Sequence, residues 1–518
     1  MVYNYGAMLC GCLKQYVFKE DPMKRIITAL LAISMVFTVF CLASCADKQN
    51  TNDNNNANKD TGDIYLDNIP EDVNFADEDD SLRTVTFVYT EGANGTYTGR
   101  SIKVEEITGD SVDAKLYERN QTVEARFGII IESIMAGTTI SNLQSNISAV
   151  LQAGDPDYDV IAGYQYFDLD IATLGYVLDI NTLDEYGADY IDIEQDYWAT
   201  DYIKNMHYGD PIYWLSGDLS LRFVGGQYCT FVNSRIYDSV LGEKYGSIYS
   251  IVKEGKWTLD MFTEMASLCY RDLNSNETAD LEDILGSITA VVNDMSDAYA
   301  VGAGVTWSVR NNDGTISITL GNTHSMNFAA KYYDIINSEW FFDCPRSDSV
   351  TEMTTFANGT VAFTVNKLYQ SEVYLREMSD NFYIIPTPKF DATQEDYRTA
   401  LHDGNTIFGI SYCSDAIPAA AVALEAMSAE SLRTVTPEFY EIALKFKYTR
   451  DDEASEMIDL IKQCAYSDFV FVWGGSLGNA THFFRTPMTN PASTFRKLQN
   501  SLTRKLNELT EDLSAKEE

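Results

Sequence analysis

Two neighbouring stretches decide the fold class: TVTFVYTEG, residues 84–92, and VDAKLYERNQTVEARFGIIIESI, residues 112–134. The first is a β-branched and aromatic run that ends in Gly, which predicts a buried strand. In the second, Leu116, Val123 and Phe127 recur on one helical face, and Gly128 is a stop signal for that helix. A further strand follows at once, so the chain alternates strand with helix.

The alternation continues along the chain. SNLQSNISAVLQAG, residues 141–154, predicts a helix, and DYDVIAGYQY, residues 157–166, predicts a buried strand that leads into an aromatic loop. Further helices are expected at 419–432 and 453–465. A carboxyl-terminal helix is indicated by apolar residues at three- and four-residue steps: Phe495, Leu498, Leu502, Leu506, Leu509 and Leu513. Such alternation predicts the α/β class with parallel packing.

The composition limits the classes of function. The 518 residues include 45% hydrophobic and 22% charged residues, which are globular proportions. The formal charge of -40 would repel a phosphate backbone, so nucleic acid is excluded as a partner. Tyr at 33 and Phe at 25 are plentiful while His at 4 is scarce, which favours binding over histidine-based catalysis.

The amino-terminal region has the pattern of an export signal. Within MKRIITALLAISMVFTVFCLASC, residues 23–45, a basic start precedes an apolar run that is too short to span a membrane. We therefore expect a signal peptide over 1–44, with Met23 as the true start. Leu42 to Cys45 resembles a bacterial lipobox, so Cys45 is expected to carry a lipid that anchors the protein to the outer face of the cell membrane. The alternative is a plain cleaved signal with an incidental cysteine.

A polar tether is expected between the anchor and the folded part. Residues 45–82 are rich in Asn and acidic side chains and show almost no apolar periodicity. Five cysteines are then left in the exported chain, and free, buried thiols are favoured over disulfides. They are Cys229, Cys269, Cys344, Cys413 and Cys464.

Beyond these patterns, the chain resembles a family 1 extracellular solute-binding protein, the lipoprotein receptor of a carbohydrate-type ABC importer. The order of several blocks carries the resemblance, which runs from about Thr84 to the carboxyl end. The blocks are LYERNQTVEARFG at 116–128, DYDVIAGYQYFDLDIATLGYVLDINTL at 157–183, GKWTLDMFTEMA at 255–266, RDLNSNETADLEDILG at 271–286, FANGTVAFTVNK at 356–367 and IIPTPKF at 384–390.

The resemblance implies a two-lobed periplasmic-binding-protein-like fold of type II, joined by hinge crossings. The crossings are expected at Gln227–Asn233, at Ile384–Pro388 and between Ser428 and Phe439. Lobe one is then 84–228 plus 387–432, and lobe two is 229–386 plus 433–518. It also implies a solute held in the cleft, an ABC permease as docking partner, a monomer, and no enzymatic activity.

The residues themselves indicate a site for a neutral sugar. Sugars present flat C–H faces and rings of hydroxyl groups, so a site needs aromatic platforms beside carboxylates and amides. For any one aromatic residue, burial as a packing residue is the alternative. The candidates, chosen mainly where strands give way to loops, are Tyr164, Gln165, Tyr166, Trp214, Trp307, Asp403, Asn405, Trp473 and Gly474.

A calcium loop is one interpretation of residues 272–283. Oxygen-bearing side chains stand at the positions that such a loop uses, although Glu277 replaces the usual Gly and Asp283 replaces the bidentate Glu. A solvated acidic connection is the alternative, and the ion would be structural; no other cofactor is required. The expected ligands are Asp272, Asn274, Asn276, Thr278 and Asp283.

An enzyme remains the main competing class. GGSLG at 474–478 matches G-x-S-x-G after an expected strand, but the one later histidine is His482, six residues on. The 77 acidic residues also leave chance carboxylate pairs open. The sequence favours a membrane-anchored receptor for a neutral sugar or oligosaccharide, with a surface carbohydrate-active hydrolase or a sugar-sensing lipoprotein without a permease as alternatives.

Overall fold

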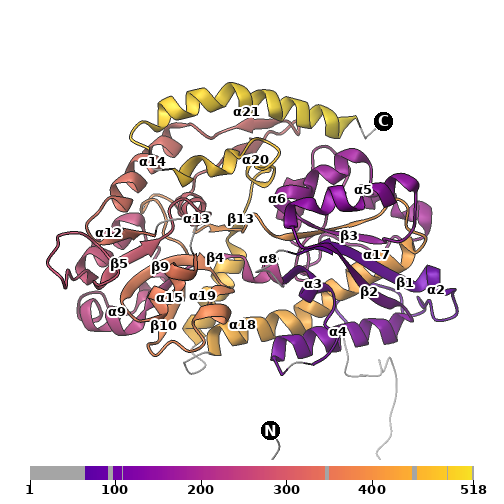
Figure 1. Cartoon of the computed structure of the whole chain (residues 1–518), viewed down its shortest axis with the longest axis horizontal. Helices are drawn as coiled ribbons and strands as arrows, with labels where there is room; N and C mark the ends of the chain where they lie inside the picture. Colours follow the sequence, from indigo (N-terminus) through magenta and orange to yellow (C-terminus); the bar gives the residue numbers. More distant parts are fainter. Residues whose placement is uncertain are drawn as a thin grey trace, which may run out of the picture. The chain divides into compact units, whose positions relative to one another are not determined.

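Two β-sheets, each assembled from strands that are distant in the sequence, organise this computed structural model (Figure 1). The structure describes residues 65–91, 97–107, 109–344, 349–445, 452–486 and 488–515. The export signal and Cys45 therefore lie outside the described residues. Residues from Tyr65 onward form one compact unit, which contains both sheets.

The first sheet has four strands in the order β12-β3-β1-β2. Strand β1 is parallel to both β2 and β3, whereas β12 is antiparallel to β3. We call the elements packed on this sheet the first lobe. The bounds of its strands are Thr84–Thr90 for β1, Ile130–Gly137 for β2, Val160–Tyr164 for β3 and Thr406–Ile410 for β12.

The second sheet has five strands in the order β10-β4-β9-β5-β8. Strand β5 is parallel to β8 and β9, and β4 is antiparallel to its neighbours β9 and β10. We call the elements packed on it the second lobe. The bounds are Tyr228–Asn233 for β4, Leu285–Thr289 for β5, Phe341–Asp343 for β8, Val361–Lys367 for β9 and Phe382–Ile385 for β10.

Helices cover both sheets, and four short strands form two further pairs. The bounds of the helices are α2 Asp80–Arg83, α3 Tyr97–Ile102, α4 Ser111–Phe127, α5 Leu143–Ala153, α6 Gln165–Asp168, α7 Thr200–Met206, α8 Leu221–Gly225, α9 Ser234–Val240, α10 Gly242–Tyr245, α11 Ile248–Lys253, α12 Leu259–Cys269, α13 Met295–Gly302, α14 Thr323–Ile336, α15 Ser349–Ala357, α16 Gln370–Tyr374, α17 Ile417–Glu430, α18 Thr436–Lys445, α19 Asp452–Gln463, α20 Phe469–Val472 and α21 Pro491–Ser514. The 3₁₀ helices are η1 Ile140–Asn142, η2 Leu169–Leu174, η3 Ile180–Tyr186 and η5 Ala480–Arg485, and η4 Ser431–Val435 is a single turn of π-helix, called the π turn below. The short strands are β6 Ser308–Arg310, β7 Ile316–Ile318, β11 Thr399–Ala400 and β13 Ala465–Tyr466.

The local expectations for the first lobe are confirmed. Helix α4 begins after Asp110, whose carboxylate accepts hydrogen bonds from the first-turn N–H groups of Val112 and Asp113. It ends at Gly128, which has a φ of 68° and lies so close to the backbone of Ala76 that a side chain would clash. The expected α/β class, with parallel strands and covering helices, is therefore what the chain forms.

The chain passes between the two lobes more than once. Strand β4 follows α8 of the first lobe directly, within the stretch where the first crossing was expected. The helical run α17, η4 and α18 continues from the first sheet toward α19, which packs on β10. Buried Arg119 of α4 donates to Ser431 Oγ in the π turn, and so ties this connection to the first lobe.

The second crossing lies later in the chain than the expected Ile384–Pro388. Trp257 Nε1 donates to the carbonyl of Pro386, and Lys389 pairs with Thr258, so this segment stays in the second lobe. The chain reaches the first sheet only at β12, after Leu401 has paired with Gln227. The segment looks like a free extended connection in the sequence, but the buried Trp257 anchors it.

Residues 65–82, assigned to the tether by composition, belong to the folded body instead. Arg126 binds Asp67 with both terminal nitrogens, at 2.7 and 3.0 Å. Ile69 is buried, and the N–H of Phe75 donates to the carbonyl of Phe127. These anchoring residues are few and irregularly spaced, so they give no periodic pattern that a sequence can show.

The carboxyl-terminal region differs from its expectation at one point. DFVFV at 468–472, which looks like a strand, forms the short helix α20, and Asp468 caps it by accepting from the Phe471 N–H. The final helix is confirmed as α21, whose apolar stripe faces the body. In Figure 1, α21 runs along the top of the view from the α14 side toward α5 and α6.

Four of the five remaining cysteines, Cys229, Cys269, Cys413 and Cys464, are free in the structure, as expected. Cys229, Cys269 and Cys344 are buried, while Cys413 and Cys464 are half-buried. Across the part of the chain that the structure describes, none of the helices has the length and apolarity needed to cross a bilayer.

A buried carboxyl group behind the second sheet gives a pH-dependent stability. Glu352 is fully buried, and its oxygens accept from Thr364 Oγ1, Asn366 Nδ2 and the Ala290 N–H. Burial raises the pKa of Glu352 from 4.5 to about 8, although these hydrogen bonds oppose the shift. The folded state therefore holds a proton that the unfolded state loses above pH 4.5.

We predict that the Glu352 contribution to stability is complete below pH 4.5 and is lost as the pH rises toward 8. Between pH 5 and 8, the unfolding free energy of the wild type should fall with rising pH more steeply than that of Glu352→Gln, by on the order of 1 kcal/mol per pH unit. The exposed Glu71→Gln is the control and should keep the wild-type slope. Equal slopes for wild type and Glu352→Gln would contradict the prediction.

Candidate functional site

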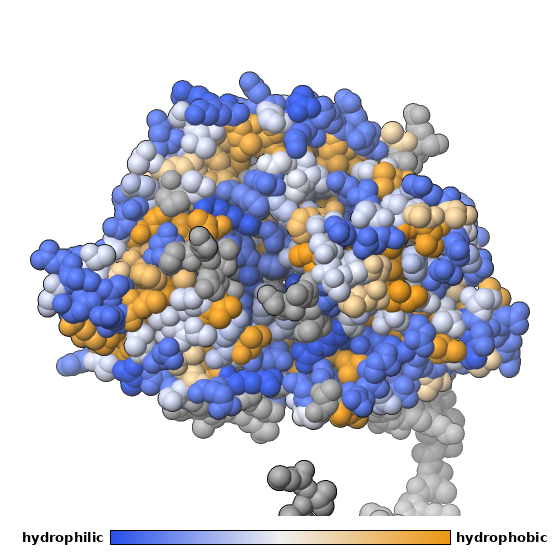
Figure 2. Space-filling view, in the orientation of Figure 1, coloured by the Kyte–Doolittle hydropathy of each residue, from blue (hydrophilic) through white to orange (hydrophobic). Residues whose placement is uncertain are grey.

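Polar and aromatic side chains gather where the carboxyl ends of the parallel strands of the two sheets face each other. In the first lobe, Glu91 follows β1 and Tyr164 ends β3; in the second lobe, Asp294 follows β5 and Lys367 ends β9. Ligand sites of open α/β sheets occupy this position. Figure 2 shows the surface hollowed between the two lobes, with hydrophilic residues around the hollow. We call this region the cleft.

A group of charges lies at the centre of the cleft, where Lys367 and His402 are buried and Asp294 is half-buried. Lys367 Nζ is 2.8 Å and His402 Nε2 is 3.0 Å from Asp294 Oδ2. Burial alone would raise the pKa of Asp294, but the Lys367 ammonium and His402 outweigh it and hold the pKa well below its usual range. Burial, with the charge of Lys367, also lowers the pKa of His402. Asp294 is therefore an ionised acceptor beside a neutral imidazole.

Arg485, at the end of η5, carries the second group of ion pairs. Its Nη2 is 2.7 Å from Asp297 Oδ2 and 2.9 Å from Asp403 Oδ2. Burial raises the pKa of Asp297 to about 7, against the opposing effect of Arg485. The other carboxylate oxygen of Asp297, Oδ1, is buried and has no hydrogen-bond partner among the described residues. A carboxylate oxygen in that position can accept a hydrogen bond from a ligand hydroxyl group.

Asp294, His402 and Asp403 are close enough to hold a metal ion in principle, but the histidine tautomer opposes it. Their ligand atoms lie within 4.8 Å of one another. However, the Gly404 N–H donates to His402 Nδ1 at 3.0 Å, so in the neutral ring the proton is on Nε2. Nε2 faces Asp294 as a donor, and Lys367 already neutralises that carboxylate. The cluster therefore functions as an ion-pair group.

Aromatic rings line the cleft beside these charges. Tyr164 packs on Phe167 at 5.6 Å, and Phe167 packs edge-on against Tyr166 at 5.0 Å. Tyr166 in turn stacks on His482, with the ring planes 2° apart. Phe167 is 39% exposed and the other three rings are half-buried, so each keeps surface available for a ligand. Burial, with the positive charge of Arg485, lowers the pKa of His482 to about 4, so this ring is neutral.

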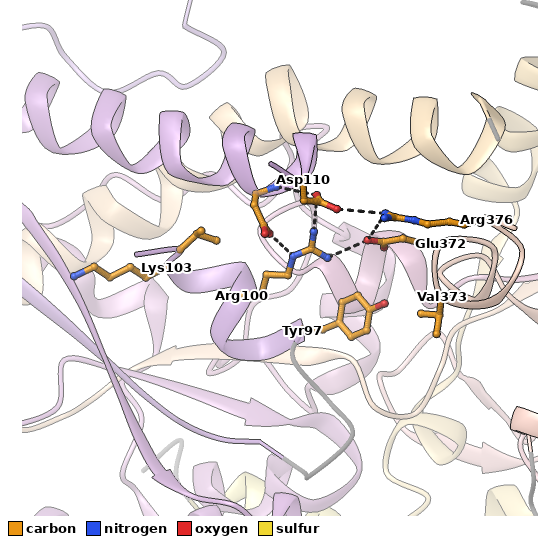
Figure 3. A pocket seen from close by; sticks show the side chains of 9 residues that line it. Tyr97, Arg100, Lys103, Asp110, Glu372, Val373 and Arg376 are labelled. Carbon is orange, nitrogen blue, oxygen red and sulfur yellow. Dashed lines mark hydrogen bonds and ion pairs between the residues drawn. The ribbon is translucent and has the colours of Figure 1, made fainter. Parts of the chain in front are cut away.

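A cavity of 560 Å³ lies at one side of the cleft, between α3 and the start of α4 in the first lobe and α16 in the second (Figure 3). Arg100 binds Asp110, Asp113 and Glu372 at 3.0, 2.6 and 3.3 Å. Arg376 reaches back to Asp110 at 3.3 Å. These pairs join the two lobes, and in Figure 3 the side chains of Tyr97 and Val373 lie beside them.

Tyr164, Tyr166 and Asp403 are brought together in the cleft. The Tyr166 N–H donates to the Asp403 carbonyl at 3.1 Å. Gln165, although adjacent in the sequence, is buried and bonds Tyr202 and the Val472 carbonyl. Asn405 is also buried, behind the aromatic residues, with its carbonyl accepting from the Gln165 N–H.

The three candidate tryptophans lie in the core, so the packing interpretation applies to each. Trp214, Trp307 and Trp473 are at most 1% exposed. Trp473 Nε1 donates to the Met206 carbonyl, and Trp214 Nε1 donates to the Leu169 carbonyl. Gly474, next to Trp473, is buried as well. An aromatic residue near a strand end looks the same in sequence whether its side chain turns toward the cleft or into the core.

Among the described residues, no histidine lies against the Ser476 hydroxyl as a catalytic serine requires. This hydroxyl donates to Asp170 Oδ1 at 2.9 Å, while His482 stacks on Tyr166. The segment before Ser476 is the helix α20 and not a strand, so the strand-turn context of a nucleophile is missing. The turn instead packs against the first lobe, with Gly475 lying against the Tyr166 carbonyl.

The acidic loop at 272–283 has part of the geometry of a calcium loop. Glu277 has a φ of 59°, so the backbone adopts the left-handed turn at the position where such loops use Gly. However, the Asp272 carboxylate accepts the N–H groups of Ser275 and Glu277, and Asp283 accepts those of Leu273 and Asp280. Among the described residues, no three acidic side chains of this loop bring their oxygens within 4.8 Å of one another. Asn274, Asn276 and Thr278 are exposed around it.

Sequence reasoning missed several residues of the cleft. Lys367 ends one strand of the second sheet and Asp294 comes after another, so the strand-end rule used for Tyr164 could have found them. His402 lies next to Asp403 in the same stretch, LHDGN. Arg485 carries no such signal, and neither does Arg222, whose Nη2 lies 3.6 Å from Glu91 Oε1. A turn after α20 and the short helix α8 bring these two residues to the cleft from outside the sheets.

No family model matches the chain, and no curated protein matches it. The comparison with solved structures does find similar folds. An ABC substrate-binding protein from Listeria monocytogenes in complex with cycloalternan has a TM-score of 0.51 at 13% identity, and covers 82% of this chain and 98% of its own. A sugar transporter protein from Rhizobium etli, in an open conformation, has a TM-score of 0.52 at 16% identity, with 83% and 99% covered.

A third similar structure has a different kind of ligand. UgpB from Mycobacterium tuberculosis, in complex with glycerophosphocholine, has a TM-score of 0.51 at 14% identity and covers 82% of this chain and 99% of its own. At these identities the likeness shows the fold, which is that of periplasmic-binding-protein-like solute receptors. The fold class expected from the sequence is therefore confirmed.

We predict that chelation lowers the melting temperature of the wild-type protein by a few degrees but leaves Asp272→Ala unchanged, because bound Ca²⁺ would stabilise the folded loop alone. Differential scanning calorimetry with and without EDTA measures this. Asp313→Ala is the matched control, since Asp313 also caps an exposed turn, at Thr315, outside this loop. A wild-type melting curve that does not respond to the chelator would count against a calcium site.

Proposed function

We propose that this protein is a membrane-anchored extracellular receptor that captures a neutral carbohydrate in its cleft and delivers it to an ABC importer. The observation that carries the proposal is the composition of the cleft. Its cations are neutralised by its own carboxylates, and half-exposed aromatic rings lie beside them.

The paired charges favour a neutral ligand. Lys367, Arg485 and Arg222 each lie within 4 Å of a carboxylate, at Asp294, Asp403 and Glu91. A charged ligand would have to break one of these pairs and leave a buried charge uncompensated, which costs several kcal/mol. A neutral, hydroxyl-rich ligand can instead hydrogen-bond to the paired groups without separating them.

Unsatisfied polar atoms favour a ligand with many hydroxyl groups. Gln227 lies at the first crossing, and both its amide oxygen and its nitrogen are buried with no hydrogen-bond partner among the described residues. Asp297 Oδ1 is also buried and has no hydrogen-bond partner among the described residues. A buried polar atom without a hydrogen-bond partner costs about 1–3 kcal/mol of stability. A ligand hydroxyl group can both donate and accept a hydrogen bond, so it would satisfy these atoms and be held beside them.

The similar structures support this assignment, because one is a complex with cycloalternan and another is described as a sugar transporter. Their identities of 13–16% make this support for the class of protein and not for a particular sugar. These similar proteins are binding proteins, which fits a receptor without enzymatic activity. The lipid at Cys45, the permease and the monomeric state are part of the proposal and rest on the sequence.

The carbohydrate proposal is tested by thermal-shift screening against a panel of neutral mono- and oligosaccharides, since a ligand that binds only the folded state raises its melting temperature. We predict that Tyr166→Ala weakens the binding of the ligand found in this way by about 2 kcal/mol, roughly thirtyfold, because the sugar ring loses the aromatic ring on which it stacks. Tyr186→Ala, with a 45% exposed ring away from the cleft, should bind normally.

Calorimetry on the three proteins gives the affinities. Full affinity in Tyr166→Ala would place the ligand elsewhere, and failure of every sugar to stabilise the wild type would overturn the carbohydrate proposal. Release of shortened sugars during the titration would favour a hydrolase instead.

The anchor proposal has its own test. We predict that Cys45→Ala is released from the membrane fraction without a change in ligand affinity, because a polar segment separates the cysteine from the cleft. Fractionation of cells that express the wild type and the variant measures the membrane-bound share. A variant that stays quantitatively in the membrane fraction would contradict the proposal.

A further inference from the structure

Seven side chains of the cleft form one continuous row of contacting groups, in which Tyr166 and His482 are stacked and the other ring pairs are tilted or edge-on. Tyr369 contacts Tyr97 at 5.1 Å, and Arg222 lies over the rings of Tyr97 and Tyr164 at 5.9 and 5.3 Å. From Tyr164 the row continues through the ring contacts that end at His482. In order, the ring row is Tyr369, Tyr97, Arg222, Tyr164, Phe167, Tyr166 and His482.

The ring row joins both lobes. Tyr369 follows β9 of the second lobe, the middle members belong to the first lobe, and His482 is in η5, which packs against α13 of the second lobe. Both end contacts of the row, Tyr369 to Tyr97 and Tyr166 to His482, therefore connect different parts of the chain. A ligand that lies on the whole row touches both lobes.

The rings keep surface for a ligand although they touch one another. Each ring of the row is half-buried or, at Phe167, exposed; Arg222 is the buried member at 8%. Rings that served packing alone would be buried, as Trp214, Trp307 and Trp473 are. A sugar ring has roughly the footprint of one aromatic side chain, so a single sugar unit leaves most of the row uncovered.

Unsatisfied polar atoms occur at both ends of the ring row and in its middle. Glu372 Oε2 is beside Tyr97 in the cavity of Figure 3, Arg222 Nε is in the middle, and His482 Nε2 is at the far end. All three atoms are buried without a hydrogen-bond partner among the described residues. The three atoms lie beside different members of the row, and a chain of sugar units presents hydroxyl groups along its length.

The cavity at the Tyr97 end provides room for such a chain. Its 560 Å³ falls within the usual size of a ligand pocket, and Tyr97, Val104 and Val373 give it apolar surface between the ion pairs. It lies at one end of the row, while the charges around Asp403 and Arg485 lie near the other.

We infer that the ligand is an oligosaccharide of at least three units that lies along the ring row, with one end at Tyr166 and His482 and the other in the cavity beside Tyr97. This inference rests on the proposed carbohydrate function and specifies the length of the ligand. The affinity is then built up from successive ring contacts, and a monosaccharide engages only part of the row.

The first experiment offers the protein mixtures of one to six units, made by partial acid hydrolysis of starch, β-1,4-galactan, β-1,4-mannan and β-1,4-xylan, and identifies the retained sugars by native mass spectrometry. We expect retained sugars of three or more units. The matching purified length series is then titrated by calorimetry, and the trimer should bind about tenfold or more tightly than the monosaccharide.

Failure of this inference and failure of the proposed function give different results. Equal affinity for the monosaccharide and the trimer would overturn the length while leaving a sugar receptor in place. Retention of no sugar from any mixture would overturn both.

A variant at the Tyr97 end provides a second test. Tyr97→Ala should lower the affinity for sugars of three or more units about tenfold. The affinity for the monosaccharide should stay within twofold, because we expect short ligands to bind at the Tyr166 end. Tyr186→Ala is the exposed control and should leave all lengths unchanged. Melting curves establish that each variant is folded. An equal loss for every length, or no loss for any, would overturn the inference.

Discussion

The ionised carboxylate of Asp294 imposes the constraint on which the centre of the molecule depends. A buried carboxylate stays charged only where cations or donors lie against it, and here Lys367 ends β9 while His402 lies in the second crossing. Asp294 itself follows β5, so three separate segments meet at one atom. Removing Lys367 or Asp294 would leave the charge of the other without its partner. The crossing is thereby held at a fixed place relative to the second sheet.

The same constraint shapes the chemistry of the cleft. Since Lys367, Arg485 and Arg222 are neutralised within the protein, the groups left for a ligand are aromatic faces and polar atoms that lack partners. The His402 tautomer, set by the Gly404 N–H, turns a set of potential metal ligands into an ion-pair group. The fold does not choose the ligand, because similar folds hold sugars in some proteins and glycerophosphocholine in another. The side chains of the site determine which ligand binds.

Much of the fold could be predicted from local patterns. The strand β1, the helix α4 with Gly128 after it, and the helix α21 follow from periodicity and from the conformational freedom of glycine, which act over a few residues. DFVFV looks like a strand but forms a helix, and a short apolar run has no period that separates a buried strand from a buried turn of helix. The segment 65–82 looks like a tether but is folded, because a few irregular anchors, such as Asp67 with Arg126, outweigh an acidic composition.

The sequence alone therefore determined the α/β class and that Tyr164, Tyr166 and Asp403 lie close to strand ends, because the end of a strand is a local property. Only the tertiary structure decided which aromatic side chains face the cleft, since Trp473 turns into the core and Phe167 turns outward. It also decided which charges meet. Arg485 and Asp297 are far apart in the chain, and their contact depends on η5 packing against α13, an arrangement that long-range packing produces and no local pattern contains.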